Sequence, residues 1–360
     1  MSMKRRGLLA AGAAAPALAT PMLANAQPQV LWRCTGSFPK STDVLWGVQE
    51  LFARRVGELT GGAFQIRNFA PGEIVPALQV LDAVGAGTVE CGYTAAYYYI
   101  GKDPTLGFGT VMPFGMNARQ QLAWLHQGGG REIMEEVYRD QGVVALPCSN
   151  TGAQMGGWLR KEIKSVDDLK GLKFRIAGIA GTVLTRLGVV AQQLGAADIY
   201  PALERGVVDG AEWVGPHDDE KLGFHRVAPY YYYPGWWEAC SQAEIQVNIK
   251  AWDALPKQYQ QVVEVVTGEM QVWSTSRYDM LNMQALRRLV GAGTQLRAYP
   301  REVLQACYKA AQDTYGELGE RNPRFRKVHT QWDRFRRDTQ GWFRVAEDSQ
   351  ANFLALIERG

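Results

Sequence analysis

Five residues in the middle of this sequence have side chains suited to holding a small charged molecule; they are Gln154, Arg175, Glu212, Trp213 and Glu238. Arg175 lies inside the apolar segment LKFRIA, where a charge is costly unless it meets an anion, and its planar guanidinium suits a carboxylate. Glu212 follows VVDGA at the expected end of a strand, where ligand residues tend to collect. Gln154, in a glycine-rich stretch, offers a neutral oxygen. The simpler alternative is an internal ion pair between Arg175 and one of the glutamates.

Glu238 lies in a strongly aromatic stretch, YYYYPGWWEACSQAE, which runs from Tyr230 to Glu244. Tyrosine and tryptophan bury large areas, so these rings can simply fill a core. A carboxylate surrounded by rings is different, because it loses its hydration and must be paired, protonated or bound to a metal. Taken alone, the stretch favours a core with Glu238 at its exposed rim.

Signals for catalysis are weak, and we expect no catalytic residue. The sequence contains neither G-x-S-x-G nor H-E-x-x-H, and its four histidines show no metal-ligand spacing. His217 and the two aspartates that follow it are expected in a solvated loop. The remaining enzymatic alternative is an exported glycoside hydrolase that uses Glu212 and Glu238 as acid and base. That alternative leaves Arg175 without a role, since an uncharged sugar does not need it.

The elements that would position these residues alternate between helix and strand. Residues 42–62 have apolar side chains at the spacing of one helical face, and residues 63–69 follow as a strand. Residues 73–94 are expected to form a helix that runs into a strand. A second copy of this order includes the strand LKFRIA and a helix over residues 181–195. Two such halves predict an α/β protein of two lobes with a ligand cleft between them.

The C-terminal part is expected to be largely helical, beginning with a long helix over residues 257–290. From Pro323 onward, five apolar residues fall near one helical face; they are Phe335, Trp342, Ala346, Phe353 and Ile357. Such a face packs on its own lobe or pairs two subunits, and the sequence leaves both alternatives open.

The N-terminus has the pattern of an export signal over residues 1–26. Lys4, Arg5 and Arg6 precede an apolar run that ends at Ala24-Asn25-Ala26, a cleavage pattern that predicts removal before Gln27. The adjacent arginines suggest the twin-arginine route. We therefore expect a mature protein that is soluble and periplasmic.

Charge and cysteine content exclude several other classes of function. The chain has 39 basic and 36 acidic residues, and removal of the signal takes away three basic residues, which leaves 36 of each. This balance gives no electrostatic basis for binding nucleic acid or an anionic membrane. The five cysteines form no C-x-x-C pair, so they indicate neither a zinc site nor a disulfide framework. Buried thiols are expected, with a single disulfide as the alternative.

Several longer motifs together resemble one family of transport proteins; they are KGLKFRIAG, YPALERGVVDGAEWVGPHDDEKLG, APYYYYPGWWE and NIKAWDALPKQYQ. They are similar to the extracytoplasmic solute receptors of tripartite ATP-independent periplasmic (TRAP) transporters, in the branch that binds 2-oxo and 2-hydroxy monocarboxylates. The resemblance covers nearly the whole mature chain. It implies two α/β lobes that close on a small acid, and it implies TRAP membrane subunits as partners.

In that branch a cation joins the ligand to the protein, and the resemblance implies roles for individual residues here. Glu212, the backbone carbonyl of Trp213 and Glu238 are expected to hold the cation, with Gln154 and Arg175 on the ligand. Oxygen donors of this kind suit Na⁺ or Ca²⁺ rather than zinc. Tyr97 or Tyr98 is expected to reach the ligand from the other lobe, and if they lie on a strand only one of them faces inward.

The expected domain organisation follows from the same comparison. Residues 27–150 form lobe I, to which a segment near 239–290 returns, and residues 151–238 form lobe II. Residues 291–360 form an extended helical C-terminal region, which is a candidate for pairing two copies into a homodimer.

Overall fold

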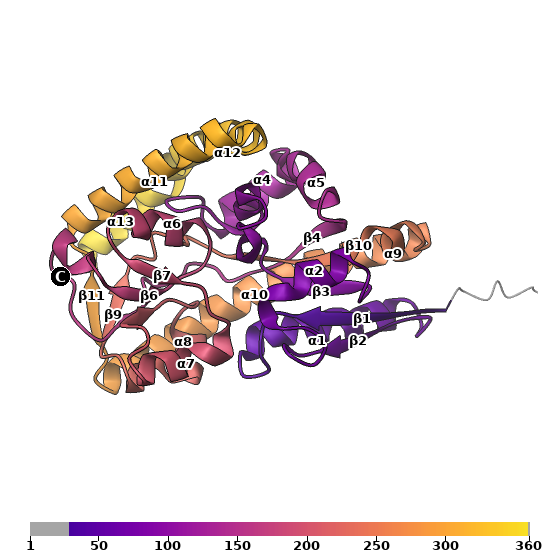
Figure 1. The fold of residues 1–360 in the computed structure, drawn as a ribbon, viewed down its shortest axis with the longest axis horizontal. Coiled ribbons are helices and arrows are strands. Elements are labelled where there is room, and N and C mark those ends of the chain that lie inside the picture. The colour runs from indigo at the N-terminus through magenta and orange to yellow at the C-terminus, as the bar shows by residue number, and fades with distance from the viewer. Residues whose placement is uncertain (1–28, 359–360) are drawn as a thin grey trace, which may run out of the picture.

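A computed structural model describes residues 29–358 and shows two α/β lobes, each built around one β-sheet (Figure 1). The predicted export signal, residues 1–26, lies outside the described residues. No helix within the described part of the chain is long and apolar enough to cross a membrane.

Lobe I is built on a five-stranded sheet whose strands lie in the order β2 (Phe64–Phe69), β1 (Val30–Gly36), β3 (Cys91–Thr94), β10 (Gln242–Asn248) and β4 (Val143–Asn150). β1 is parallel to β2 and β3, whereas β10 is antiparallel to both of its neighbours. A strand from late in the chain therefore lies inside the sheet that the N-terminal segment begins.

Lobe II is built on a six-stranded sheet with the order β11 (Gln295–Ala298), β9 (Tyr230–Tyr233), β5 (Trp158–Leu159), β8 (Gly210–Ala211), β6 (Lys173–Arg175) and β7 (Val190–Gln192). β6 is parallel to β7 and β8, so three short strands end at the same edge. Residues 295–298, in the C-terminal region expected to be helical, add a strand to this sheet.

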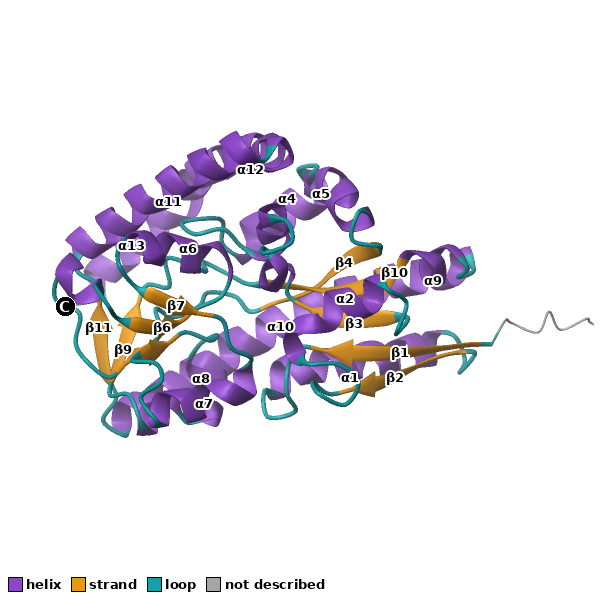
Figure 2. Cartoon of the chain, viewed as in Figure 1, coloured by secondary structure: helices purple, strands orange, loops and turns teal. Residues whose placement is uncertain are grey.

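Helices cover both sheets (Figure 2). The helices of lobe I are α1 (Asp43–Leu59), α2 (Val80–Gly85), α3 (Gly107–Thr110), α4 (Ala118–Gln127), α5 (Gly130–Arg139) and α9 (Ile249–Asp253), with short 3₁₀ turns η1 (Ala77–Gln79), η2 (Ala96–Tyr99) and η3 (Pro104–Leu106). Those of lobe II are α6 (Gly178–Arg186), α7 (Ala196–Glu204) and α8 (Pro216–Leu222), with η4 (Val166–Leu169) and η5 (Phe224–Arg226).

The apolar face predicted for residues 42–62 forms the core side of α1. Val48, Phe52 and Val56 on this face are fully buried, and the helix packs against β2 and α10 (Lys257–Gly291). Burial of such side chains stabilises the lobe by about 1.5 to 3 kcal/mol each. All five cysteines are buried and free, as the sequence predicted.

Four connections join the lobes. Residues 151–157 lead from β4 to β5, and residues 234–241 return from β9 to β10. The 35-residue helix α10 then packs on β4 and α1 of lobe I and on α8 of lobe II. At the top of Figure 1, α11 (Arg301–Arg321) packs on α6 of lobe II and α12 (Pro323–Phe343) packs on α4 and α5 of lobe I. A π turn (Arg344–Asp348) and α13 (Ser349–Ile357) complete the chain.

One helix of lobe II is shorter than the sequence predicted. The helix expected over residues 181–195 ends at Arg186, because Gly188 adopts a positive φ of 88°, and residues 190–192 form β7 instead. The helix and the strand expected within residues 73–94 are both present, as η1 and α2 over residues 77–85 and as β3 over Cys91–Thr94.

Candidate functional site

Parallel pairing of β6 and β8 brings two of the candidate residues together. Arg175 is the last residue of β6, and its register partner is Ala211, the last residue of β8. Glu212 follows Ala211 directly, so the arginine and the glutamate leave the same edge of the lobe II sheet. This edge faces lobe I, which is the usual place for ligands in an α/β fold.

Arg175 is fully buried and makes most of its hydrogen bonds inside lobe II. It donates to the Glu212 carboxylate, to the Glu212 main-chain oxygen at 2.7 Å and to the Leu194 main-chain oxygen at 3.1 Å. Its guanidinium also lies 5.1 Å from the Trp213 ring centre. The internal ion pair considered from the sequence is therefore present, but it leaves the Nη2 atom of Arg175 buried without a partner.

The charges of this pair depend on each other. Burial would lower the pKa of Arg175, but the Glu212 carboxylate raises it above its ordinary value. Burial raises the pKa of Glu212, whereas the Arg175 charge and the Ala177 amide hydrogen bond oppose that rise. Since the guanidinium keeps its proton and donates directly to Glu212, the pair is charged, and Oε2 of Glu212 has no hydrogen-bond partner among residues 29–358.

The two extended segments that connect the lobes supply Gln154 and Glu238. They are tied side by side, because the Thr151 N–H donates to the Ser241 carbonyl at 3.0 Å and the Ser241 N–H donates to the Thr151 hydroxyl at 3.0 Å. Gln154 donates to the same hydroxyl at 3.2 Å, which leaves its Oε1 atom buried and unpartnered. Gly235 allows the close approach, since a Cβ atom there would lie 2.5 Å from the Gln154 carbonyl oxygen.

Glu238 is buried, so the expectation of a rim glutamate was wrong. Its exposed fraction is 1%, and neither carboxylate oxygen has a hydrogen bond of normal geometry to any described residue. Burial raises the pKa of Glu238 well above its ordinary value, and the charge of Glu212 raises it further. Arg175 and the nearby hydroxyls of Ser241 and Tyr97 oppose this rise without cancelling it. By itself Glu238 is therefore held in its protonated, neutral form, and it can ionise in this position only beside a positive charge.

Many rings of the aromatic stretch that precedes Glu238 are core, as the sequence alone favoured. Tyr231 stacks on Trp158 with ring centres 4.0 Å apart, and Tyr232 packs on Tyr299. Trp236 and Trp237 are both buried. These rings pack on other rings of the hydrophobic core, and Glu238 follows Trp237 directly in the chain.

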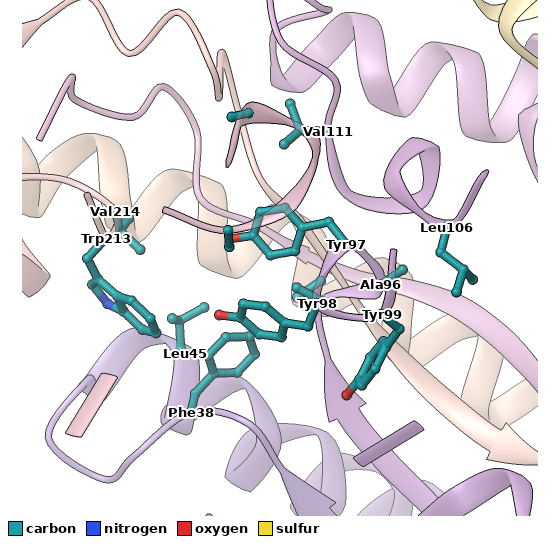
Figure 3. Close-up of a cluster of buried hydrophobic side chains, with 14 of the residues drawn as sticks. Phe38, Leu45, Ala96, Tyr97, Tyr98, Tyr99, Leu106, Val111, Trp213 and Val214 are labelled. Carbon is teal, nitrogen blue, oxygen red and sulfur yellow. The ribbon is translucent and has the colours of Figure 1, made fainter. Parts of the chain in front are cut away.

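Tyr97 and Tyr98 enter from lobe I, and both line the same cavity as Gln154 and Trp213. On a strand only one of these tyrosines could face inward, but residues 96–99 form the 3₁₀ turn η2. Figure 3 shows both rings pointing from η2 toward Trp213, whereas the Tyr99 hydroxyl points away. Burial raises the pKa of Tyr97 and of Tyr98, so both remain neutral hydrogen-bond donors.

The cavity between the lobes is small, with a volume of about 20 Å³. Its apolar walls include Phe38 and Leu45 of lobe I and Val214 of lobe II (Figure 3). Two residues of the lining, Gln154 and Trp213, have a buried polar atom without a partner, Oε1 and Nε1 respectively. So do three residues whose charges act on the cavity tyrosines Tyr97 and Tyr98: Arg175 at Nη2, Glu212 at Oε2 and Glu238 at both carboxylate oxygens. Buried polar atoms in native proteins nearly always have partners, so this group indicates a ligand site.

The donor set fits a hard cation. Glu212 Oε2 and the two oxygens of Glu238 are carboxylate oxygens without hydrogen bonds. No histidine or cysteine belongs to this cavity lining. Oxygen donors alone suit Na⁺ or Ca²⁺ and disfavour zinc or copper.

A larger cavity in lobe I, of about 260 Å³, lacks this character. It lies between α5, β4, β10 and α10, and Glu244 is at its buried end. Both Glu244 oxygens accept hydrogen bonds, from Tyr138 and from Gln246. None of the described residues that line it has an unpartnered buried polar side-chain atom. Volume alone is therefore a poorer guide to the site than unsatisfied hydrogen bonds.

Part of this region could not be recognised from the sequence. Phe38, Leu45 and Thr151 line the cavity but carried no chemical signal; Leu45 was assigned only to the apolar face of a helix. The expectation of a solvated loop for His217 and the two aspartates after it was also wrong. All three residues are buried in α8, and a Pro at the first helical position was the available signal.

Comparison with known proteins identifies the family. The family model of bacterial extracellular solute-binding proteins, family 7, called DctP, matches residues 36–322. The chain belongs to the DctP family. Because this is a family of solute-binding proteins, the chain is a receptor and not an enzyme, and the glycoside hydrolase alternative has no support. The geometry agrees, since Glu212 is bonded to Arg175 and is not a free acid or base.

Individual members of the family are closely similar to this receptor. A monocarboxylate 2-oxoacid-binding periplasmic protein of a Nostoc species is 49% identical, over 98% of this chain and 99% of the relative. A TRAP transporter solute-binding protein from Bordetella bronchiseptica is 50% identical, and its crystal structure matches with a TM-score of 0.90 over 92% of this chain and 99% of that chain. That structure is described as a mixed-occupancy dimer with copurified calcium and picolinate. A receptor from Pseudoalteromonas atlantica with bound sodium and pyruvate is 35% identical with a TM-score of 0.88, over 90% of this chain and 99% of that chain. These structures confirm the two-lobed fold.

Proposed function

We propose that this protein is the periplasmic receptor of a TRAP transporter for a small 2-oxo or 2-hydroxy monocarboxylate, which it binds together with Na⁺ or Ca²⁺. The observation that carries the proposal is the set of unpartnered buried polar atoms between the lobes. A cation and an acid together supply what those atoms lack: positive charge for the glutamates and acceptor oxygens for Arg175 and Trp213. The related proteins with calcium and picolinate, or with sodium and pyruvate, support the same pairing.

In this proposal Glu212, Glu238 and the backbone carbonyl of Trp213 hold the cation. A bound cation supplies a positive charge that lets both glutamates stay ionised in a site without water. Arg175, through its unpartnered Nη2 atom, and Gln154 bind the acid. The shielding of charge is mutual, because each occupant reduces the repulsion that the other meets, and such coupling is reciprocal.

Tyr97 and Tyr98 complete the polar wall from lobe I. Since burial keeps both phenols neutral, their hydroxyls can donate to the acid without adding negative charge. The remaining walls, Phe38, Leu45 and Val214, are apolar and leave room for a short alkyl group only. The proposed ligand is therefore pyruvate-like or lactate-like rather than a dicarboxylate or a sugar.

Charge counting accommodates either cation. Arg175 contributes +1, the two glutamates contribute −2 and the acid contributes −1, so Ca²⁺ makes the site neutral and Na⁺ leaves it at −1. Buried net charge is costly, but one unit is tolerated where hydrogen bonds are complete. Direct detection of the cation is therefore part of the test.

The test combines native mass spectrometry with calorimetry. Protein purified without added ligand should carry a mass that matches one cation and one small acid. After unfolding in chelator and refolding with Na⁺ or Ca²⁺, the protein should bind pyruvate and lactate. Propionate, which keeps the carboxylate and a short alkyl group but lacks the 2-oxygen, should bind at least about 100-fold more weakly, because buried polar groups of the site then stay unpaired. Equal affinity for propionate and pyruvate would contradict the proposed ligand class.

We further propose that the α13 region pairs two receptors. Apolar side chains that are 39% to 76% exposed follow one another near the C-terminus; they are Trp342, Val345, Phe353, Leu354, Leu356 and Ile357. The Bordetella bronchiseptica relative, described as a dimer, supports a second copy as the partner. Leu356→Glu with Ile357→Glu should convert a dimer into a monomer in light scattering, whereas Leu31→Glu, at a 70% exposed site of lobe I, should not. A wild-type monomer would contradict this proposal.

Two finer expectations from the sequence belong to the same proposal. We propose lobe boundaries at 27–150 and 151–238, with a return segment near 239–290, a C-terminal helical region over 291–360 and export by the twin-arginine route. The strands support the boundaries, because the lobe I sheet uses residues 30–150 and 242–248, whereas the lobe II sheet uses residues 158–233 and 295–298. N-terminal sequencing should find Gln27 first, and replacing Arg5 and Arg6 by lysine should stop export.

A further inference from the structure

Asp43 connects the two lobes at a position outside the ligand cavity. It is the first residue of α1, in lobe I, and its carboxylate contacts His217 Nε2 at 2.8 Å and Lys221 Nζ at 2.7 Å, both from α8 of lobe II. Arg277 Nη2, on α10, lies 3.5 Å from the other carboxylate oxygen. We call Asp43, His217, Lys221 and Arg277 the Asp43 latch.

The surface that receives Asp43 is fixed in place. The main-chain N–H of His217 donates to Asn282 Oδ1 at 3.0 Å, and the Tyr278 hydroxyl donates to Asp218 Oδ2 at 2.8 Å. Two hydrogen bonds therefore tie α8 to α10. Asp219 is buried and accepts hydrogen bonds from Trp158 and Tyr231 of the lobe II sheet. α8 is therefore tied to α10, which also packs on α1, so a relative movement of the lobes must change both the contacts of Asp43 and the packing of α1 on α10.

The latch is coupled to the cavity through short stretches of backbone on both sides. Leu45, two residues after Asp43, lines the cavity, and so does Trp213, four residues before His217. A rotation that moves Leu45 away from Trp213, as ligand entry into a 20 Å³ cavity requires, also separates Asp43 from α8. The other cross-lobe contacts near this point, such as Phe38 against Trp213 with ring centres 6.4 Å apart, involve cavity walls.

A metal site is a poorer explanation of this cluster. Donor atoms of Asp43, His217 and Asp218 lie within 4.8 Å of one another, which is a spacing that a metal could use. However, the Asp43 carboxylate already faces the positive charges of Lys221 and Arg277. A divalent cation would be repelled by both, so the cluster is arranged for contact between lobes.

We propose that the Asp43 latch sets the affinity of this receptor by stabilising the closed arrangement of the lobes, without touching the ligand. A protein that closes around its ligand binds more tightly when the closed state is favoured in advance. Loss of the latch should therefore weaken binding about 5- to 50-fold, a range typical of coupling between sites, and should act mainly by speeding ligand release. This inference rests on the proposed function only for the ligand used to measure it.

The test compares Asp43→Asn with Glu90→Gln. Glu90 forms an ion pair with Arg33 at 2.7 Å, within lobe I and at similar exposure, so it controls for loss of an ordinary surface pair. Pyruvate binding is followed by stopped-flow tryptophan fluorescence. Asp43→Asn should release pyruvate 5 to 50 times faster with little change in the association rate, and Glu90→Gln should match wild type. Asp43→Glu, which keeps the charge at the start of α1, should recover most of the loss.

Two more measurements separate the outcomes. Lys221→Met should weaken binding as well, and combining it with Asp43→Asn should give less than the product of the two effects, because both remove one contact. Small-angle X-ray scattering of the ligand-free protein should show a larger radius of gyration for Asp43→Asn than for wild type. If wild type binds pyruvate and Asp43→Asn binds it within twofold, the latch is overturned. If wild type binds no pyruvate, the proposed function fails instead. In that case the latch is overturned if ligand-free Asp43→Asn has the same radius of gyration as wild type.

Discussion

Replacing Glu238 by glutamine tests the central claim that this buried acid holds a cation. The variant keeps a side-chain oxygen and nearly the same volume, but it removes one negative charge from a site where neither carboxylate oxygen has a hydrogen bond. At a separation of about 4 Å and an effective dielectric constant of about 20, one pair of unit charges is worth on the order of 4 kcal/mol. The variant should therefore bind the cation roughly 1,000-fold more weakly.

Thermal unfolding converts this loss into a measurable shift. At a cation concentration of about 100 times its dissociation constant, wild type gains about 2.7 kcal/mol of unfolding free energy. For a chain of this size each kcal/mol raises the melting temperature by about 2 °C, so wild type should gain about 5 °C. At the same concentration the variant would be at about a tenth of its dissociation constant, where the gain is below about 0.1 kcal/mol.

The control is Glu244→Gln, which also neutralises a buried carboxylate but leaves the cavity between the lobes unchanged. Glu244 already accepts hydrogen bonds from Tyr138 and Gln246, so its variant should keep the full cation-dependent shift. Without cation, Glu238→Gln should be at least as stable as wild type, because it removes an unpaired buried acid. A Glu238→Gln protein that still gains 5 °C with Na⁺ or Ca²⁺ would refute the assignment.

Three other changes have clear expected outcomes. Arg175→Met should abolish pyruvate binding in calorimetry. Because it leaves Glu212 as a buried unpaired acid, it should also lower the free energy of unfolding measured in urea by about 3 to 5 kcal/mol. Adding Glu212→Met should restore stability but not binding. Gly235→Ala should force the two connecting segments apart, costing about 1 to 3 kcal/mol and weakening binding, because its Cβ would lie 2.5 Å from the Gln154 carbonyl oxygen. Burial raises the pKa of Glu244 to about 7, so the folded protein binds a proton that the unfolded chain releases near pH 4.5. The free energy of unfolding should therefore fall by up to about 3 kcal/mol as the pH rises from about 4.5 to about 7. Glu244→Gln should remove this part of the pH dependence.

The Arg175 prediction shows where sequence reasoning needed the structure. From the sequence, Arg175 was expected to bind the ligand, and an ion pair with one of the glutamates was the simpler alternative. The structure buries it completely in an ion pair with Glu212. An arginine within an apolar strand indicates an anionic partner, but the identity of that partner depends on which strand lies alongside, and pairing of β6 with β8 is a long-range event.

Local patterns were sufficient where one element decides the outcome. The apolar spacing of residues 42–62 predicted α1, and the charge of Arg175 within an apolar strand indicated an ion pair with one of the glutamates as an alternative to ligand binding. Prediction failed where tertiary contacts overrule local preference. Tyrosines 97–99 have strand propensity but form η2, where the Tyr97 N–H donates to the Thr110 hydroxyl at 3.2 Å. His217 looked exposed because of its charged neighbours, yet those aspartates are paired with buried tyrosines.

The place of β10 in the lobe I sheet has a consequence for the order in which the chain folds. β10 lies between β3 and β4, so the edges of both strands stay unpaired until residue 248 is available. Residues 158–233, by contrast, contain five of the six strands of lobe II in one continuous stretch. Contacts that are near in sequence form sooner than distant ones. We therefore expect lobe II to fold first. The sheet of lobe I should stay incomplete until β10 is available to pair with β3 and β4.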